Sequence, residues 1–378
     1  MTIAFDAKRA AQNGTGLGNY SRFLISLLAR FAPEESLLLY IPHPEKTTYL
    51  NRLPPSDQLQ TRFPSSPLYR TFPSLWRSFG ITHLFRADGV NLYHGLSGEL
   101  PLNIGRAKGL KKIVTIHDLL FRRFPQGYHT IDRTIYDFKF HRACRNADRI
   151  IAVSEFTKQE IIKYYAIPTE RISVVYQGCD PAFSKPVEED LKQEVRQIYG
   201  LQDPFILYVG TIEERKNLLL LARALRHVDP TIKVVAVGRR TPYTIKVEEF
   251  LKENRLEHRL VMFHNVPFIH LPALYQLATL FVYPSRCEGF GIPLLEALST
   301  GTPAMGCTGS CLEEAGGPDS IYVDPDDEMQ LASAINETFF NDHRRDEMVE
   351  KGKAYALRFS DEQLFSDLWS VYEQTLQQ

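Results

Sequence analysis

Two glutamates, Glu288 and Glu296, are the first candidates for chemistry, in the stretch CEGFGIPLLEALSTGTP. Residues on one helical face recur every three or four positions, so their wider spacing is not that of an ion-pair face. Pro293 suits the first turn of a helix that ends before Gly301, which puts Glu288 in a loop and Glu296 inside the helix. Backbone N–H groups from Phe290 to Ile292 could then bind a phosphate, with carboxylates on both sides to accept sugar hydroxyl protons.

Two adjacent cations form the second candidate. In YVGTIEERKNLLLL a strand ends at Gly210, and the loop before the next helix carries Arg215 and Lys216. Hydrogen bonds to charged groups contribute about 1.5–3 kcal/mol each, enough to hold a departing diphosphate. Both patterns have alternatives without a ligand. The carboxylates could cap a turn and complement a helix dipole, for tenths of a kcal/mol to about one each, and the cations could be solvated by water.

The N-terminal half contributes a glycine loop and a His-Asp pair. NGTGLGNY places Gly14, Gly16 and Gly18 before an amphipathic helix, which suits either a backbone seat for a phosphate or acceptor hydroxyl, or a tight structural loop. It is a poor dinucleotide fingerprint, because the second strand lacks the acidic residue that holds an adenosine ribose. VTIHDL puts His117 and Asp118 at a strand end, where they suit either polar contacts with a sugar or a turn.

An acidic run, Asp324 to Asp327, superficially matches a metal-binding Asp-x-Asp pattern. It directly precedes the helical stretch EMQLASAINETF. Asp is a favoured N-cap residue, and acidic side chains are favoured in the first turn of a helix. The pattern therefore favours a helix cap over a metal site.

These residues need a scaffold, and the hydrophobic pattern predicts one. Short apolar, β-rich runs alternate with helical stretches such as Tyr20–Phe31 and Glu155–Tyr165, and the pattern restarts after the polar stretch CDPAFSKPVEEDLKQ. The expected strands are 2–7, 36–42, 90–95, 111–118, 148–154 and 171–178, then 205–210, 232–238, 259–265, 278–285, 302–307 and 320–325. The sequence predicts two doubly wound α/β domains with parallel sheets, whose ligands bind in a cleft at the carboxyl ends of strands.

Composition narrows the class of protein. The 378 residues are 44% apolar and 24% charged, with a formal net charge of -1 that gives no overall attraction to nucleic acid. The five cysteines are scattered, which indicates reduced thiols. The N-terminus lacks a charged leader followed by an apolar core, and no apolar run approaches about 18 residues. A cytoplasmic protein without a membrane span is expected.

Together, four segments resemble the retaining glycosyltransferases of family 4, which have the two-Rossmann GT-B fold. These are GTGLGNY, TIHDL with ADRIIAVSEFTKQEI, YVGTIEERKNL, and EGFGIPLLEALSTGTP followed by SCLEEAGG and VDPDD. The resemblance implies an N-terminal acceptor-side domain, 1–182 with a crossover helix at 361–378, and a nucleotide-sugar domain, 183–360. The implied catalytic residues are His117, Arg215, Lys216 and Glu288. The implied donor-binding residues are Gly16, Gly210, Arg215, Lys216, Glu288, Phe290, Gly291, Ile292 and Glu296.

Within this set the resemblance assigns the nucleotide ribose to Glu296, the donor sugar to Glu288 and nearby backbone, and the diphosphate to Arg215 and Lys216. It implies transfer with retention, no bound metal, no other cofactor and no protein nucleophile. The sequence departs from the family pattern at two positions that bear on these roles. Glu214 replaces a frequent proline and puts the rigidity of its loop in question, and Asn19 replaces a frequent cation after the glycine loop.

The resemblance is strongest to bacterial mannosyltransferase-like members and favours GDP-mannose as donor, with a saccharide or lipid-linked saccharide as acceptor. A UDP-sugar donor carrying glucose, galactose or N-acetylglucosamine is the alternative, followed by a nucleotide-sugar epimerase and a two-domain solute-binding module. The aromatic and basic segment Phe121–Arg142 suits a glycan-lipid at the inner face of the cell membrane, although a solvated amphipathic helix also explains it.

Overall fold

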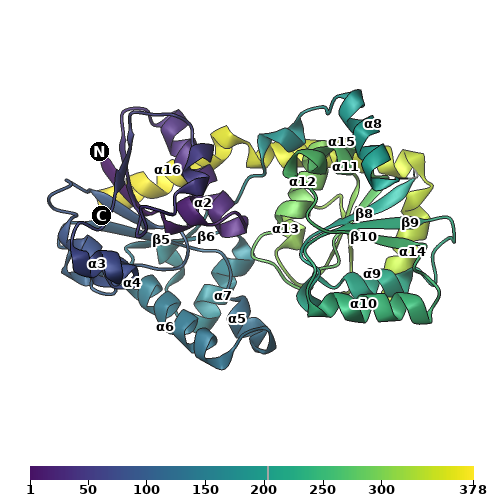
Figure 1. Ribbon diagram of the computed structural model, residues 1–378, viewed down its shortest axis with the longest axis horizontal. Helices are drawn as coiled ribbons and strands as arrows, with labels where there is room; N and C mark the ends of the chain where they lie inside the picture. Colours follow the sequence, from purple (N-terminus) through teal and green to yellow (C-terminus); the bar gives the residue numbers. More distant parts are fainter. Residues whose placement is uncertain (202–203) are drawn as a thin grey trace. The chain divides into compact units, whose positions relative to one another are not determined.

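The computed structural model of the chain describes residues 1–201 and 204–378. They form two compact units, Met1–Gln177 with Asp361–Gln378, and Gly178–Ser360 (Figure 1). The boundary predicted from the sequence, after residue 182, lies slightly later. Each unit contains one parallel sheet with helices on both faces, so the expected pair of doubly wound α/β domains is confirmed.

The sheet of the first unit has seven parallel strands. Their order is β3 (Leu59–Arg62), β2 (Ser36–Tyr40), β1 (Thr2–Asp6), β4 (Leu92–Gly95), β5 (Lys111–Ile116), β6 (Arg149–Ala152) and β7 (Ile172–Val174). The direction of winding reverses between β1 and β4. Ligands of doubly wound sheets bind at such a switch point, beyond the carboxyl ends of the strands.

Both faces of this sheet are covered. Its helices are α1 (Lys8–Gln12), α2 (Gly16–Phe31), α3 (Pro67–Thr71), α4 (Pro73–Leu75), α5 (Leu120–Arg123), α6 (Thr130–Asn146), α7 (Glu155–Tyr165) and α16 (Asp361–Gln377). Ile3 and Phe5 pack on the face covered by α1, α2 and α16, whereas Ala4 packs on the opposite face with the segment around Trp76. Alternate residues of one strand are thus buried on opposite faces, which explains the nearly continuous apolar strands.

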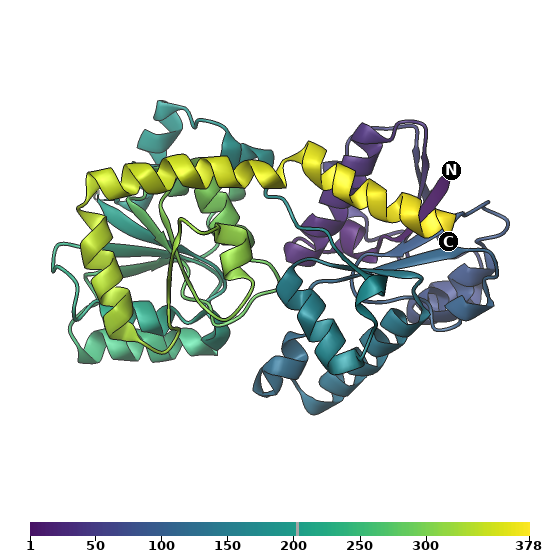
Figure 2. The same ribbon diagram turned by 180° about the vertical axis from the view of Figure 1, so that it is seen from behind.

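The C-terminal helix α16 belongs to the first unit (Figure 2). Leu368, Val371 and Tyr372 enter the core beside α2. The Tyr372 hydroxyl lies 2.7 Å from Nδ1 of buried His94, whose Nε2 lies 2.8 Å from the Thr115 hydroxyl. Because these polar groups are buried but mutually satisfied, they tie the end of the chain to β4 and β5.

The second unit repeats the design with six parallel strands. Their order is β10 (Leu260–Phe263), β9 (Lys233–Val237), β8 (Phe205–Val209), β11 (Leu280–Val282), β12 (Ala304–Cys307) and β13 (Ile321–Val323). Its helices are α8 (Glu189–Tyr199), α9 (Leu218–Ala224), α10 (Pro242–Glu253), α11 (Leu271–Leu277), α12 (Ile292–Thr300), α13 (Leu312–Gly316), α14 (Glu328–Phe339) and α15 (Asp342–Ala356). Here the switch point lies between β8 and β11, the strands that precede both candidate loops.

Strand β3 and helix α1 are among the elements that have no counterpart in the sequence prediction. The polar edge strand β3, with sequence LQTR, pairs only with β2. The short helix α1 occupies the interval between β1 and the glycine loop. Among the described residues, no helix has both the length and the apolar character needed to cross a bilayer.

Candidate functional site

The loops after β8 and β11 meet at the switch point of the second unit. The Arg286 N–H donates to the carbonyl of Arg215 at 2.9 Å, which joins the two loops through their backbones. The first loop carries Gly210, Arg215 and Lys216, and the second carries Glu288. Topology therefore brings together residues that are far apart in the sequence, as the rule for strand ends predicts.

The loop after β8 is held at both ends by side chains. The Thr241 hydroxyl donates to the carbonyl of Ile212 near its start. At its end, buried Asn217 donates from Nδ2 to the carbonyl of Pro325 at 2.8 Å. Glu214 is exposed between these two attachments. This residue stands where relatives often have a proline, which had put the rigidity of the loop in question. The loop is thus ordered by its neighbours rather than by a proline.

Gly210 is required by the same loop. Its φ of +157° is one that side-chain-bearing residues rarely adopt, and an added Cβ would lie 3.2 Å from Cδ of Lys216. A side chain at residue 210 would therefore press on the lysine that we consider part of the site.

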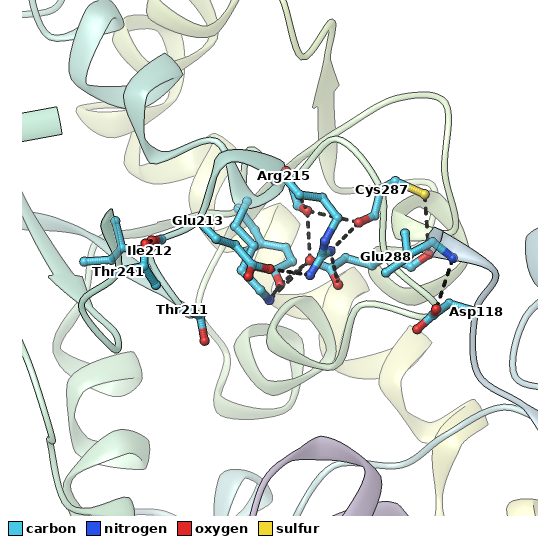
Figure 3. Close-up of polar contacts among 12 residues, drawn as sticks. Asp118, Thr211, Ile212, Glu213, Arg215, Thr241, Cys287 and Glu288 are labelled. Carbon is cyan, nitrogen blue, oxygen red and sulfur yellow. Dashed lines mark hydrogen bonds and ion pairs between the residues drawn. The ribbon is translucent and has the colours of Figure 1, made fainter. Parts of the chain in front are cut away.

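The charged side chains of the two loops form one cluster (Figure 3). Glu288 accepts from Arg215 Nη1 at 2.7 Å and lies 3.2 Å from Nζ of Lys216. Arg215 also donates to Glu213 at 2.6 Å. The side chains of Arg215, Lys216 and Glu288 are 13–19% exposed. Because they are largely buried, water and salt screen their charges less than the charges of a surface ion pair, so each charge strongly affects the other two.

The protonation of Glu288 follows from this cluster. Burial opposes its ionisation, but the ion pairs with Lys216 and Arg215 outweigh burial and lower its pKa to about 2. The hydroxyls of Tyr283 and Ser285 each donate to the same carboxylate at 2.8 Å. Glu288 is therefore an ionised acceptor that holds both cations in place.

Helix α12 begins beside this cluster and has the predicted bounds, with Pro293 in its first turn and Gly301 as its C-cap. The N-cap Gly291 has φ +113°, and an added Cβ would lie 2.8 Å from Leu312. In the described part of the chain, the N–H groups of Gly291 and Ile292 have no acceptor. Phe290 buries its ring, so only its backbone could face a ligand. The structure thus presents amide donors next to the cations.

Glu296 lies one turn into α12, as predicted. The Tyr275 hydroxyl donates to its Oε2 at 2.9 Å. Burial raises the pKa of Glu296 to about 7, although the hydrogen bond from Tyr275 acts in the opposite direction. Glu296 and Glu288 thus lie on either side of the helix start but differ in charge below neutral pH.

The acidic run after β13 is a helix cap. Asp327 is the N-cap of α14 and accepts from the N–H groups of Met329 and Gln330, which confirms the predicted cap. Asp326 pairs with Arg286 at 2.7 Å. Within residues 1–201 and 204–378, no group of three His, Cys, Asp or Glu side chains is placed to hold a metal ion.

In the first unit, His117 lies directly after β5. Its Nε2–H donates to the carbonyl of Leu96 at 2.9 Å, and its Nδ1 lies 3.4 Å from Nε2 of Gln177. Burial lowers its pKa to about 4, so the ring is neutral at pH 7. The hydrogen bond to Leu96 assigns the ring proton to Nε2 and leaves Nδ1 as an acceptor.

The glycine loop leads into α2, which begins at Gly16. An added Cβ on Gly18 would overlap the carbonyl of Asn13, whereas one on Gly16 would meet no atom within 4 Å. Gly18 is therefore required for close packing against the backbone of Asn13. Gly16, in contrast, faces open space. Asn19, the departure noted above, accepts from Arg22 at 2.6 Å, so it orders the loop from within.

The predicted site residues thus fall into two groups. Gly210, Arg215, Lys216, Glu288, Phe290, Gly291, Ile292 and Glu296 share the switch point of the second unit, and Gly16 and His117 lie at the carboxyl edge of the first. Sequence reasoning missed the residues that orient them: Glu213, Tyr275, Tyr283, Ser285 and Gln177. The only signal was a tyrosine close to the end of an otherwise apolar strand, in LFVYPS.

Comparisons with known proteins agree with this geometry. Residues 21–183 match the family model described as Glycosyltransferase Family 4, and residues 192–355 match the model described as Glycosyl transferases group 1. The O-antigen chain mannosyltransferase B of Escherichia coli is 27% identical over 99% of this chain and 100% of its own length. The O-antigen chain mannosyltransferase RfbU of Salmonella typhimurium is 25% identical over 86% of this chain and 88% of its own.

Solved structures support the fold. Anabaena Alr3699/HepE, crystallised with UDP and glucose, superposes with a TM-score of 0.78 at 18% identity, over 99% of this chain and 100% of that one. WaaG, a glycosyltransferase involved in lipopolysaccharide biosynthesis, gives a TM-score of 0.70 at 15% identity, over 98% and 99%. The predicted GT-B fold class is confirmed.

Proposed function

Because the chain belongs to the family 4 glycosyltransferases, we propose that it transfers mannose from GDP-mannose to a saccharide or lipid-linked saccharide in polysaccharide biosynthesis, with retention of anomeric configuration. The observation that carries this proposal is the cluster of Arg215, Lys216 and Glu288 beside the start of α12. The choice of mannose is supported by the names of the two O-antigen relatives.

In the proposed reaction the cluster binds the diphosphate of the donor. As the bond from the anomeric carbon to the diphosphate breaks, negative charge builds up on the leaving phosphate. Arg215, Lys216 and the amide groups of α12 are already oriented to stabilise this charge. The acceptor hydroxyl attacks from the side on which the diphosphate leaves and passes its proton to the departing phosphate oxygen, so no protein nucleophile is needed.

The remaining residues would position the two substrates. Glu296 would accept hydrogen bonds from the nucleotide ribose, and Glu288 would accept one from the donor sugar while holding the cations. His117 is neutral, so in this scheme its Nδ1 accepts from the sugar in place of the 3.4 Å contact with Nε2 of Gln177, and the ring offers no acidic proton. Gly16 would allow a substrate to approach the backbone closely.

A donor screen tests the proposal. The purified chain is incubated with GDP-mannose or with UDP-glucose, UDP-galactose or UDP-N-acetylglucosamine, and released nucleoside diphosphate is measured with and without an oligosaccharide acceptor. We expect release from GDP-mannose above the others, and an α-linked product by NMR. Preference for a UDP-sugar would change the donor but keep the reaction. An isomerised donor without transfer would instead indicate an epimerase.

Replacing Glu296 by alanine is expected to weaken binding of the nucleoside diphosphate by about 1–3 kcal/mol, because the ribose hydroxyls lose their acceptor. The raised pKa adds a pH dependence: Glu296 is protonated below about pH 7 and ionised above it. A better acceptor forms on ionisation, so affinity should rise with pH through this range. Calorimetric titration of GDP into the wild-type, Glu296→Ala and Glu296→Gln proteins measures both effects.

The Glu296→Gln variant separates this carboxyl from the titration of the phosphate itself. It should retain only the pH dependence that belongs to the nucleotide. Unchanged affinity in Glu296→Ala would remove this residue from the site and leave it a helix residue paired with Tyr275.

Transfer is expected to continue at full rate after divalent cations are removed with a chelator. Arg215, Lys216 and the amides of α12 supply the positive potential, and the nearby carboxylates of Asp326 and Asp327 are already engaged with Arg286 and with α14. Rates with EDTA, and with EDTA followed by excess magnesium or manganese, measure this. Activity that EDTA abolishes and a metal restores would contradict the metal-free mechanism.

A further inference from the structure

Large apolar side chains are exposed on one side of the first unit. Four of them lie on the consecutive helical turns from α3 through residues 76–80, and three lie on α6 at positions that share one helical face. They are Leu68, Phe72, Leu75 and Phe79, and Ile131, Ile135 and Phe138, all 41–75% exposed. Single exposed apolar residues are ordinary, but a group of this size marks a surface that contacts something other than water.

The two groups belong to one surface. Leu102 donates from its N–H to the carbonyl of Ser78 at 2.8 Å and accepts at its own carbonyl from Arg142 of α6 at 2.6 Å. Asn103 donates to the carbonyl of Phe79 at 2.9 Å. The segment 102–103 thus joins the end of the first group to α6, and both lie on the sheet face opposite α2 and α16 (Figures 1 and 2).

The same part of the chain is strongly basic. Residues 61–146 contain 14 Lys and Arg and five Asp and Glu, although the whole chain contains 44 and 45. Three of the five acids are neutralised, since Asp88, Glu99 and Asp137 each pair with an arginine of this segment. Exposed cations flank the apolar side chains: Arg70, Arg86, Arg106, Lys108, Arg142 and Arg145.

We propose that this surface, the basic apolar face formed by α3, α4, α6 and residues 76–108, binds an anionic lipid bilayer. Apolar side chains at this density insert between acyl chains, and cations around them bind acidic head groups. The exposed side chains around the apolar residues are arginines and lysines, which repel a basic partner and attract an acidic one. The excess of positive charge therefore favours binding of this face to a negatively charged surface.

Vesicle flotation tests the proposal without donor or acceptor, so its result is independent of the transferase reaction. The full chain is mixed with vesicles of phosphatidylcholine alone or of phosphatidylcholine with phosphatidylglycerol. The wild-type chain should float with the anionic vesicles only, and added salt should release it. Double variants Phe72→Ser/Leu75→Ser and Arg106→Ser/Lys108→Ser should each lower the bound fraction about tenfold.

Matched controls lie in the second unit. Phe268→Ser/Ile269→Ser removes two comparably exposed apolar side chains, and Lys246→Ser/Lys252→Ser removes two exposed cations of α10. Both controls should float like the wild type, and thermal melting should show that all variants are folded. A wild-type chain that does not bind anionic vesicles would overturn the proposal. So would equal loss in the control variants, or binding that survives both substitutions in the basic apolar face.

Discussion

Arg215→Ala and Lys216→Ala are each expected to slow sugar transfer about 100-fold or more while the protein stays folded. Each side chain contributes a charge that would meet the leaving diphosphate, and neither belongs to the apolar core. Both are only 15–19% exposed and are oriented by Glu288, so the charge is in place before the donor binds. Initial rates of nucleoside diphosphate release measure the loss, and melting temperatures show whether the fold is intact.

Arg240→Ala provides the matched control. Arg240 follows the neighbouring strand β9 and pairs with Glu248, but it is exposed and has no contact with Glu288. It should turn over at the wild-type rate. If Arg215→Ala and Lys216→Ala also kept normal rates, the loop after β8 would be a solvated loop and the proposed diphosphate site would be wrong.

Glu288→Gln should separate binding from catalysis. The amide keeps the size of the side chain but removes the charge that pairs with Arg215 and Lys216. A diphosphate would no longer compete with a carboxylate for these cations, so GDP should bind as tightly as before or several-fold more tightly. Transfer should nevertheless fall about 100-fold, because the cations lose their orientation and the donor sugar loses an ionised acceptor.

Two measurements are needed, GDP affinity by calorimetry and turnover of the nucleotide sugar. Glu213→Gln is the control, since the Glu213 carboxylate also pairs with Arg215 at 2.6 Å but is more exposed, and Lys216 pairs with Glu288 instead. Its turnover should fall much less. Affinity and turnover that fall together in Glu288→Gln would contradict this role and would make the carboxylate a simple ligand of the diphosphate.

Much of the scaffold could be predicted, because the signals were local. Buried parallel strands read as continuous apolar runs, and Pro293 and Gly301 bracket α12 through the stereochemistry of helix ends. Strand β3 escaped prediction because LQTR is a polar edge strand whose pairing depends on β2 rather than on its own pattern.

The site was predictable where residue type and position at a strand end coincided, as for Arg215 and Glu288. It was not predictable where tertiary contact decides. Tyr275 and Tyr283 look like core aromatics in the sequence, yet their hydroxyls donate to Glu296 and Glu288. The pairing of Glu288 with both cations also depends on two loops more than 70 residues apart, at 2.7 and 3.2 Å. No local pattern contains that information.

A crystal structure of the chain with GDP tests the central claim most directly. The claim is that the switch point between β8 and β11 binds the donor nucleotide. We predict the diphosphate within hydrogen-bonding distance of Arg215 and Lys216, and the ribose hydroxyls on the carboxylate of Glu296. A nucleotide bound with its diphosphate elsewhere, while Arg215 and Lys216 remain paired with Glu288 alone, would contradict it.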